Sequence, residues 1–227
     1  MKSVGPSATC NDALLRESKE ELVNIRDYEQ SIVIDIEPVS KGMQRLQKDV
    51  CYARKSVAEK IARVQRGLPK GVRLKIIDGY RPLSAQKRIY WQYFKQLRSE
   101  HPGWSRSEVI KELDRWVTNP YTQIPPHSTG GTLDLTIEDS SGKELDMGTP
   151  VNTADSKKAR TLSKKIPAKA VRNRALLIKS MSKEGFVNYS LEWWHWSYGD
   201  WRWAIANKTL AIYGIADKFR SRGKKRE

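Results

Sequence analysis

Hydrophobic residues recur along the chain at helical spacing in several segments. Apolar positions three or four residues apart predict amphipathic helices over residues 56–68 and 83–100. A third helix is expected after Ser105 and Glu108, which form a capping box in front of an apolar stripe. The chain thus has a substantial helical part.

Two further helices are expected near the C-terminal third, at about residues 153–165 and 173–184. Gly185 directly follows the second of these segments, where a C-cap glycine commonly stands. Both segments are rich in lysine and arginine.

Other segments have the spacing of strands. Residues 32–36 are a short β-branched run that predicts a strand. Residues 73–77 predict a second strand, which ends in a turn marked by Gly79 and Pro82. Residues 132–137 alternate strictly, so three apolar side chains face one side while Thr132, Asp134 and Thr136 face the other. The aromatic run EWWHWSYGDWRW predicts one or two more strands. With no repeat and no clean linker, the pattern favours a single α+β domain.

The excess of basic residues is concentrated in two stretches of the chain. The 227 residues include 42 Lys plus Arg against 26 Asp plus Glu, a net charge of +16. Residues 157–183 hold ten basic residues and residues 218–226 hold six, with no acid in either stretch. Such basic stretches indicate either solvated surface or attraction to nucleic acid, to an anionic wall or membrane, or to an anionic substrate.

The sequence gives little direct indication of compartment. No apolar run is long enough for a membrane span, and the start lacks the apolar region of a secretory signal. We therefore expect a cytoplasmic protein, or a periplasmic or secreted one whose signal peptide has been removed. The two cysteines, Cys10 and Cys51, form no CxxC pair and are expected to be buried free thiols.

Two of the three histidines lie in patterns that suit a metal. His127 stands in a Pro- and Gly-rich loop seven residues before Asp134, and that loop can aim the imidazole over the start of the strand. Nitrogen and carboxylate oxygen ligands of this kind suit zinc. His101 is expected to be an ordinary surface residue.

His195 offers a third ligand, and Glu192 lies three residues before it. A catalytic zinc usually keeps three protein ligands and an open position for water, which needs a nearby carboxylate to take its proton. Residues three apart on a strand point to opposite faces, so a turn or bulge near Trp193 is required. The alternative is an aromatic core strand in which His195 only donates or accepts a hydrogen bond.

Arg81 follows a strand end in the sequence DGYRP. A guanidinium on a short rigid turn suits stabilisation of the oxyanion that forms when water attacks an amide. A structural ion pair with Asp78 is the other interpretation.

Four motifs together resemble one known family. In order they are DGYRP followed by SAQ, HSTGGTLDLT, ELDMGTP and EGFVNYSLEWWHWSYGDWRWA. This chain resembles the D-alanyl-D-alanine dipeptidases, zinc metallopeptidases related to the hedgehog-type fold, over about residues 20–215. The resemblance implies a small antiparallel sheet flanked by helices, preceded by a loose leader at residues 1–19 and followed by a basic tail at 216–227.

The resemblance also implies residue roles. His127, Asp134 and His195 are expected to bind one Zn²⁺ per chain, Glu192 to act as general base, and Arg81 to stabilise the tetrahedral intermediate. The implied reaction is zinc-dependent hydrolysis of D-alanyl-D-alanine or a related small D-peptide, with water activated by zinc and Glu192.

Departures from the family pattern concern the two ends of the substrate. Pro125 and Thr132 replace a serine and an alanine of the first metal motif, and that serine is expected to help hold the substrate carboxylate. Asn152 stands where the family has an aspartate that pairs with the free ammonium of the dipeptide. Asp78, Tyr80 and Asn152 are expected to contact the substrate, and the preference is expected to have shifted toward a blocked, longer or different peptide.

Two other functions stay open from the sequence. One is a D,D-carboxypeptidase of the same chemistry that acts on peptidoglycan stem peptides, with the basic segments held against the anionic wall. The other is a nucleic-acid or polyanion-binding module with structural histidines, which no recognised nucleic-acid motif supports. We therefore expect a small D-peptide partner, with peptidoglycan as a further candidate, and neither nucleic acid nor a membrane span. The oligomeric state is not indicated.

Overall fold

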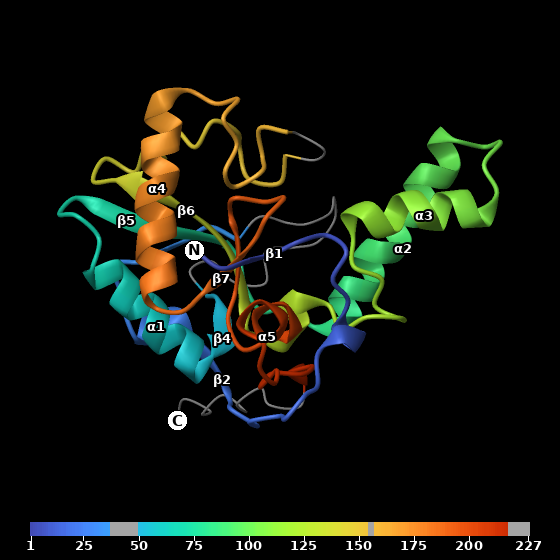
Figure 1. Cartoon of the computed structure of the whole chain (residues 1–227), viewed down its shortest axis with the longest axis horizontal. Coiled ribbons are helices and arrows are strands. Elements are labelled where there is room, and N and C mark those ends of the chain that lie inside the picture. Colours follow the sequence, from blue (N-terminus) through green and yellow to red (C-terminus); the bar gives the residue numbers. More distant parts are fainter. Residues whose placement is uncertain (37–49, 154–156, 218–227) are drawn as a thin grey trace, which may run out of the picture.

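A six-stranded sheet forms the centre of the protein (Figure 1). The computed structural model describes residues 1–36, 50–153 and 157–217. The strands are β1 Ser3–Val4, β2 Leu22–Asn24, β3 Val33–Ile34, β4 Tyr52–Arg54, β5 Val72–Asp78, β6 Thr132–Asp139, β7 Val187–Tyr189 and β8 His195–Ser197. The helices are α1 Lys55–Arg66, α2 Leu83–Glu100, α3 Arg106–Trp116, α4 Ala168–Lys183 and α5 Trp201–Asn207, with short 3₁₀ turns η1 Cys10–Asp12, η2 Ile25–Asp27 and η3 Pro126–Thr129. The expected single α+β domain is confirmed.

The strand order in the sheet is β1-β7-β8-β6-β5-β3, while β2 and β4 pair separately. The four central strands are antiparallel, as expected, and the edge strands β1 and β3 pair parallel to β7 and β5. β5 and β6 share the longest register, and it shifts between Ile76 and Asp78. That irregularity lies at the end of β5 that is paired with Asp134, where the polar residues gather.

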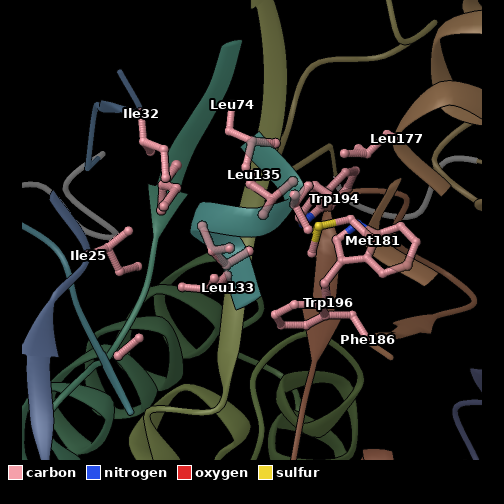
Figure 2. Close-up of a cluster of buried hydrophobic side chains, with 14 of the residues drawn as sticks. Ile25, Ile32, Leu74, Leu133, Leu135, Leu177, Met181, Phe186, Trp194 and Trp196 are labelled. Carbon is pink, nitrogen blue, oxygen red and sulfur yellow. The ribbon is translucent and has the colours of Figure 1, made fainter. Parts of the chain in front are cut away.

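Strand β6 alternates as the sequence predicts, but both of its faces are buried. Leu133, Leu135 and Ile137 belong to the main hydrophobic core, part of which is drawn in Figure 2. Thr132 on the other face donates to Asp200 at 2.8 Å and lies 3.1 Å from the hydroxyl of Ser197. Hydrogen bonding makes this polar face compatible with burial.

Helices α1 and α4 lie beside one another on one side of the sheet (Figure 1). Helix α4 contributes Leu177 and Met181 to the core (Figure 2). It ends where Gly185 takes a positive φ of 83° and Phe186 donates back to the carbonyl of Met181 at 3.2 Å. The expected glycine at the end of this helix is confirmed.

Helices α2 and α3 form an arm that projects from the body and has its own small core (Figure 1). This second core contains Tyr90, Leu97, Val109 and Leu113. The capping box of α3 is present, with Ser105 accepting from the backbone of Glu108 and donating to its carboxylate. None of the helices in the described parts is long and apolar enough to cross a membrane.

Two expectations differ from the structure, and a third lies mostly outside the described residues. Residues 157–165 form turns instead of the helix expected at 153–165, and positions 154–156 lie outside the described residues. The final aromatic run forms β8 and then α5, because Asp200 caps a helix by accepting from the backbone of Trp203. Most of the expected basic tail, residues 218–227, is also outside the description.

The expected loose leader is also corrected, because residues 1–19 are tied to the body at several points. Strand β1 pairs with β7, Leu15 forms a β-bridge with Ala211, and the backbone of Arg16 donates to the Ala211 carbonyl at 2.8 Å. These backbone hydrogen bonds hold the N-terminal segment against the sheet and the C-terminal part. The domain limits of 20 and 215 stay a prediction.

Candidate metal centre

Two of the predicted metal ligands face one another across the sheet. Asp134 on β6 is directly opposite His195 on β8 in the antiparallel register. Directly opposite residues in such a pair project to the same face, so their side chains can meet. The nearest oxygen of Asp134 lies 2.9 Å from Nδ1 of His195.

The third predicted ligand comes from the turn η3. His127 places Nε2 at 3.3 Å from the other carboxylate oxygen of Asp134. Its Nδ1 lies 3.0 Å from the carbonyl oxygen of Gly79, which can accept a hydrogen bond from the ring N–H. That hydrogen bond leaves the lone pair of Nε2 directed at the cluster, the arrangement typical of a metal-binding histidine.

A buried arginine fixes the turn that carries His127. Arg54 is fully buried, and its Nε donates to the carbonyl of Thr129 at 2.8 Å. Its backbone also donates to Gly130, which has a left-handed φ of 71°. The turn is therefore held to strand β4 by both the backbone and the side chain of one residue.

The three predicted ligands form one compact buried cluster. Each of His127, Asp134 and His195 offers a ligand atom, and these atoms all lie within 4.8 Å of one another. Burial alone raises the pKa of Asp134, but the two histidines outweigh it and hold that pKa well below its usual range. Two imidazole nitrogens and one ionised carboxylate are the donor set that suits a catalytic zinc, so the residues fit the metal that the sequence predicts.

Glu192 lies beside this cluster, just before β8. Its carboxylate oxygen is 3.6 Å from Nδ1 of His195. The backbone turns here, because His195 donates to the carbonyl of Glu192 at 3.3 Å, so the predicted turn around Trp193 is confirmed. Desolvation raises the pKa of Glu192, which makes the carboxylate a stronger base than an exposed one.

Arg81 is anchored beside the turn that carries His127. One of its terminal nitrogens pairs with Asp78 and the other donates to Gln86 at 2.7 Å. Its backbone donates to the carbonyl of His127 at 3.1 Å. The structural ion pair considered from the sequence is present, and the guanidinium still lines the pocket described next.

A pocket of about 260 Å³ opens over the cluster. His127, Asp134, His195, Glu192 and Arg81 all line it. It continues away from the metal ligands along the end of α3 and the loop after it, and it also touches the N-terminal segment; the lining residues there include Pro6, Thr9, Asp114, Trp116, Thr118 and Asn119. The site is therefore larger than the ligand cluster alone.

The three expected substrate contacts are placed differently from one another. Asn152 lines the pocket, with a positive φ of 59°. Asp78 pairs with Arg81 and accepts from the backbone of Gly79, so it supports the arginine. Tyr80 directs its hydroxyl to Asp217 at 2.6 Å, outside the pocket, which does not support direct substrate contact.

Sequence reasoning missed Arg202 and Tyr189, which also line the pocket. Arg202 places its guanidinium 4.0 Å from the centre of the Tyr189 ring. Both residues lie in the motif that contains Glu192 and His195, seven residues or fewer from His195. Their proximity in sequence was the available signal, but the start of helix α5 at Trp201 was not predicted.

Comparison with known proteins identifies the family. A family model described as D-ala-D-ala dipeptidase matches residues 36–212. This chain belongs to the D-Ala-D-Ala dipeptidase family. Among curated members, the D-alanyl-D-alanine dipeptidases of Synechocystis and Escherichia coli are each 32% identical, over 153 and 125 residues that cover 57% and 55% of this chain. The protein of that name from Enterococcus faecalis is 34% identical over 137 residues, or 57% of this chain.

These matches span 60%, 54% and 64% of the lengths of the three dipeptidases. A solved structure of VanYB in complex with D-Alanine-D-Alanine is also similar, with 15% identity and a TM-score of 0.42. That similarity covers 81% of this chain and 95% of the other.

Proposed function

We propose that this chain is a zinc-dependent peptidase that hydrolyses D-alanyl-D-alanine or a related small D-amino-acid peptide. The observation that carries the proposal is the buried cluster of His127, Asp134 and His195, with Glu192 beside it. Membership of the D-Ala-D-Ala dipeptidase family supports the substrate class.

The residues of the site divide the chemistry between them. His127, Asp134 and His195 would hold the metal, which when bound supplies Lewis-acid chemistry that polarises a carbonyl and activates water. Glu192 takes the proton of the attacking water on its carboxylate and later returns it to the nitrogen of the departing D-residue. Its pKa is raised by burial, which makes the carboxylate a stronger base than an exposed glutamate and so favours the first transfer.

Arg81 has the second role. Its anchoring to Asp78 and Gln86 fixes the guanidinium at the wall of the pocket before substrate arrives. A fixed positive charge stabilises the negative charge that develops on the scissile carbonyl oxygen. The catalytic groups therefore come from β6, β8, the turn η3 and the end of β5.

Replacement of Glu192 by glutamine tests this assignment. We expect Glu192→Gln to bind zinc as the wild type does and to lose D-alanine release by about 100-fold or more, because general acid–base catalysis contributes at least that factor. Zinc content and D-alanine release from D-Ala-D-Ala are measured on the same samples. Undiminished release by the variant removes Glu192 from the mechanism.

A second candidate function is a D,D-carboxypeptidase that acts on peptidoglycan stem peptides. The continuation of the pocket toward Asp114, Trp116 and Asn119 favours it, because this part gives room for residues before the scissile bond. D-alanine release from D-Ala-D-Ala and from an N-acylated analogue separates the two functions. A strong preference for the free dipeptide supports the dipeptidase and rejects the carboxypeptidase.

A further inference from the structure

The basic stretch over residues 157–183 forms one continuous surface, which the proposed function does not use. Its first part, residues 157–165, forms turns, and helix α4 makes up most of the rest. Arg174 of α4 is buried and donates to the carbonyls of Arg160 and Lys158 at 2.7 and 2.9 Å. These hydrogen bonds hold the turns against the helix, so the two parts of the stretch lie side by side.

The outer face of α4 is basic along its length. Leu177 and Met181 turn one face of the helix to the core, and the opposite face lies toward solvent (Figure 1). Arg172, Lys179 and Lys183 are exposed, and their separations of seven and four residues place them on one stripe of the helix. The stripe therefore presents several positive charges in the same direction.

Other side chains do little to neutralise these charges. Eight exposed cations have no ion pair or hydrogen bond from their side chains within the parts of the chain that the structure describes: Lys157, Arg160, Lys164, Lys165, Lys169, Arg172, Lys179 and Lys183. Residues 157–183 contain no Asp or Glu. Asp146 lies beside α4, where its carbonyl accepts from Asn173 at 2.7 Å, but one carboxylate leaves most of the positive charge uncompensated.

Two large apolar side chains are exposed among these cations. Leu162 is 73% exposed in the turns between Arg160 and Lys164, and Val171 at the start of α4 is 45% exposed. Val171 lies three residues before Arg174, which anchors the turns, so both project from the same side of the helix. Apolar side chains that project between basic ones are typical of surfaces that bind the headgroup region of an anionic bilayer.

We propose that this basic surface, residues 157–183, docks the protein onto an anionic phospholipid bilayer, with Leu162 inserted among the headgroups. Six of the eight exposed cations are lysines, compact charges that suit diffuse attraction to many headgroups. Nucleic acid is a poorer match, because residues 157–183 contain no aromatic side chain on which a base can stack. A soluble polyanion would leave Leu162 without an apolar partner.

The basic surface adjoins the loop that carries Glu192. The backbone of Thr161 donates to the carbonyl of Ser190 at 3.2 Å, and the backbone of Trp193 donates to the carbonyl of Ala159 at 3.1 Å. Docking would therefore hold this loop close to the lipid headgroups. Docking itself requires neither metal nor turnover, so it is tested separately from the proposed function.

Sedimentation of the full chain with lipid vesicles tests the proposal. We expect the protein to pellet with phosphatidylcholine vesicles that contain phosphatidylglycerol, to stay in solution with phosphatidylcholine alone, and to be released by added salt. The combined variant Lys164→Gln, Lys165→Gln and Arg172→Gln should bind the anionic vesicles at least about 10-fold more weakly, because each basic residue near the surface contributes several-fold to the affinity. Wild-type protein that pellets with neither kind of vesicle, or equally with both, overturns the proposal.

The matched control removes the same charge from the arm, which lies on the other side of the molecule from α4 (Figure 1). It combines Arg88→Gln, Lys95→Gln and Lys111→Gln, all exposed positions on α2 and α3. We expect this variant to bind the anionic vesicles within about 2-fold of the wild type, because its charges lie away from the docked surface. Equal losses in the two triple variants would show that only net charge matters and would overturn the assignment of the surface.

Leu162→Ser separates a bilayer from a soluble polyanion. It should weaken binding to anionic vesicles by about 5- to 10-fold, because an inserted leucine leaves water, and it should leave retention by soluble polyphosphate unchanged. Leu14→Ser is the matched control, since Leu14 is 76% exposed outside the basic surface, and it should bind vesicles as the wild type does. Vesicle binding that Leu162→Ser does not alter overturns the bilayer and assigns the surface to a soluble polyanion or an anionic wall polymer.

Discussion

Removal of the Arg54 guanidinium should destabilise both the fold and the metal site. This side chain is fully buried between β4, the His127 turn and the C-terminal segment. Its Nε donates to Thr129 at 2.8 Å, and one terminal nitrogen donates to Gly214 at 3.2 Å while also pairing with Glu17 at 3.3 Å. The substitution Arg54→Met keeps much of the apolar volume and removes all of these donors.

The expected loss of unfolding free energy follows from the buried groups that lose their partner when Arg54 is replaced by methionine. The carbonyl oxygens of Thr129 and Gly214 lose a charged donor in a buried place, and Glu17 loses its partner. Breaking a buried ion pair costs about 3–5 kcal/mol of unfolding free energy, which for a chain of this size lowers Tm by about 6–20 °C. Because Thr129 lies two residues after His127, zinc affinity should also fall, by about 10-fold.

Urea unfolding of the metal-free proteins measures the first effect, and chelator competition measures the second. The matched control is Arg63→Met, which removes a guanidinium that is 46% exposed and paired with Glu184 at 2.8 Å. A surface pair of this kind contributes at most about 1 kcal/mol. The reasoning is refuted if Arg54→Met is no less stable than Arg63→Met.

Two further predictions test the packing around the site. Cys51 is buried and its thiol pKa is raised by desolvation, whereas Cys10 is partly exposed. A thiol reagent should therefore label one cysteine in the native protein and two in urea. Rapid labelling of both cysteines in the native protein would contradict the burial of Cys51. Gly131→Ala would place a methyl group 2.4 Å from the carbonyl oxygen of Tyr198. This overpacking should lower the unfolding free energy by about 1–3 kcal/mol. Unchanged urea unfolding would contradict the expected clash and show that the backbone relaxes freely.

The sequence predicted the parts of the site that depend on local pattern. Strict alternation in β6 placed Asp134 on the face opposite to that of Leu133 and Leu135. Residues three apart on a strand point to opposite faces, so a turn was required between Glu192 and His195. Both features follow from backbone periodicity alone, and both are present. The convergence of His127 on Asp134 needed only a tight loop, which proline and glycine supply.

Other features depend on contacts that are distant in sequence. The basic stretch at 157–165 has helical composition, but its turns are held from outside by Arg174, which donates to the carbonyls of Arg160 and Lys158 at 2.7 and 2.9 Å. The local sequence of residues 157–165 does not predict these hydrogen bonds. The position of Arg202 depends likewise on the cap by Asp200, which starts helix α5. The aromatic pattern of this segment predicted a strand instead of that helix.

Zinc titration of the metal-stripped protein, followed by D-alanine release from D-Ala-D-Ala, tests the central claim most directly. The account predicts that activity is absent without metal and rises linearly until one zinc is bound per chain. Asp134→Ala, which removes the carboxylate shared by His127 and His195, should neither bind zinc at that stoichiometry nor gain activity. Full hydrolysis by the stripped protein, or equal restoration of Asp134→Ala by zinc, would contradict the assignment of the cluster as the catalytic metal site.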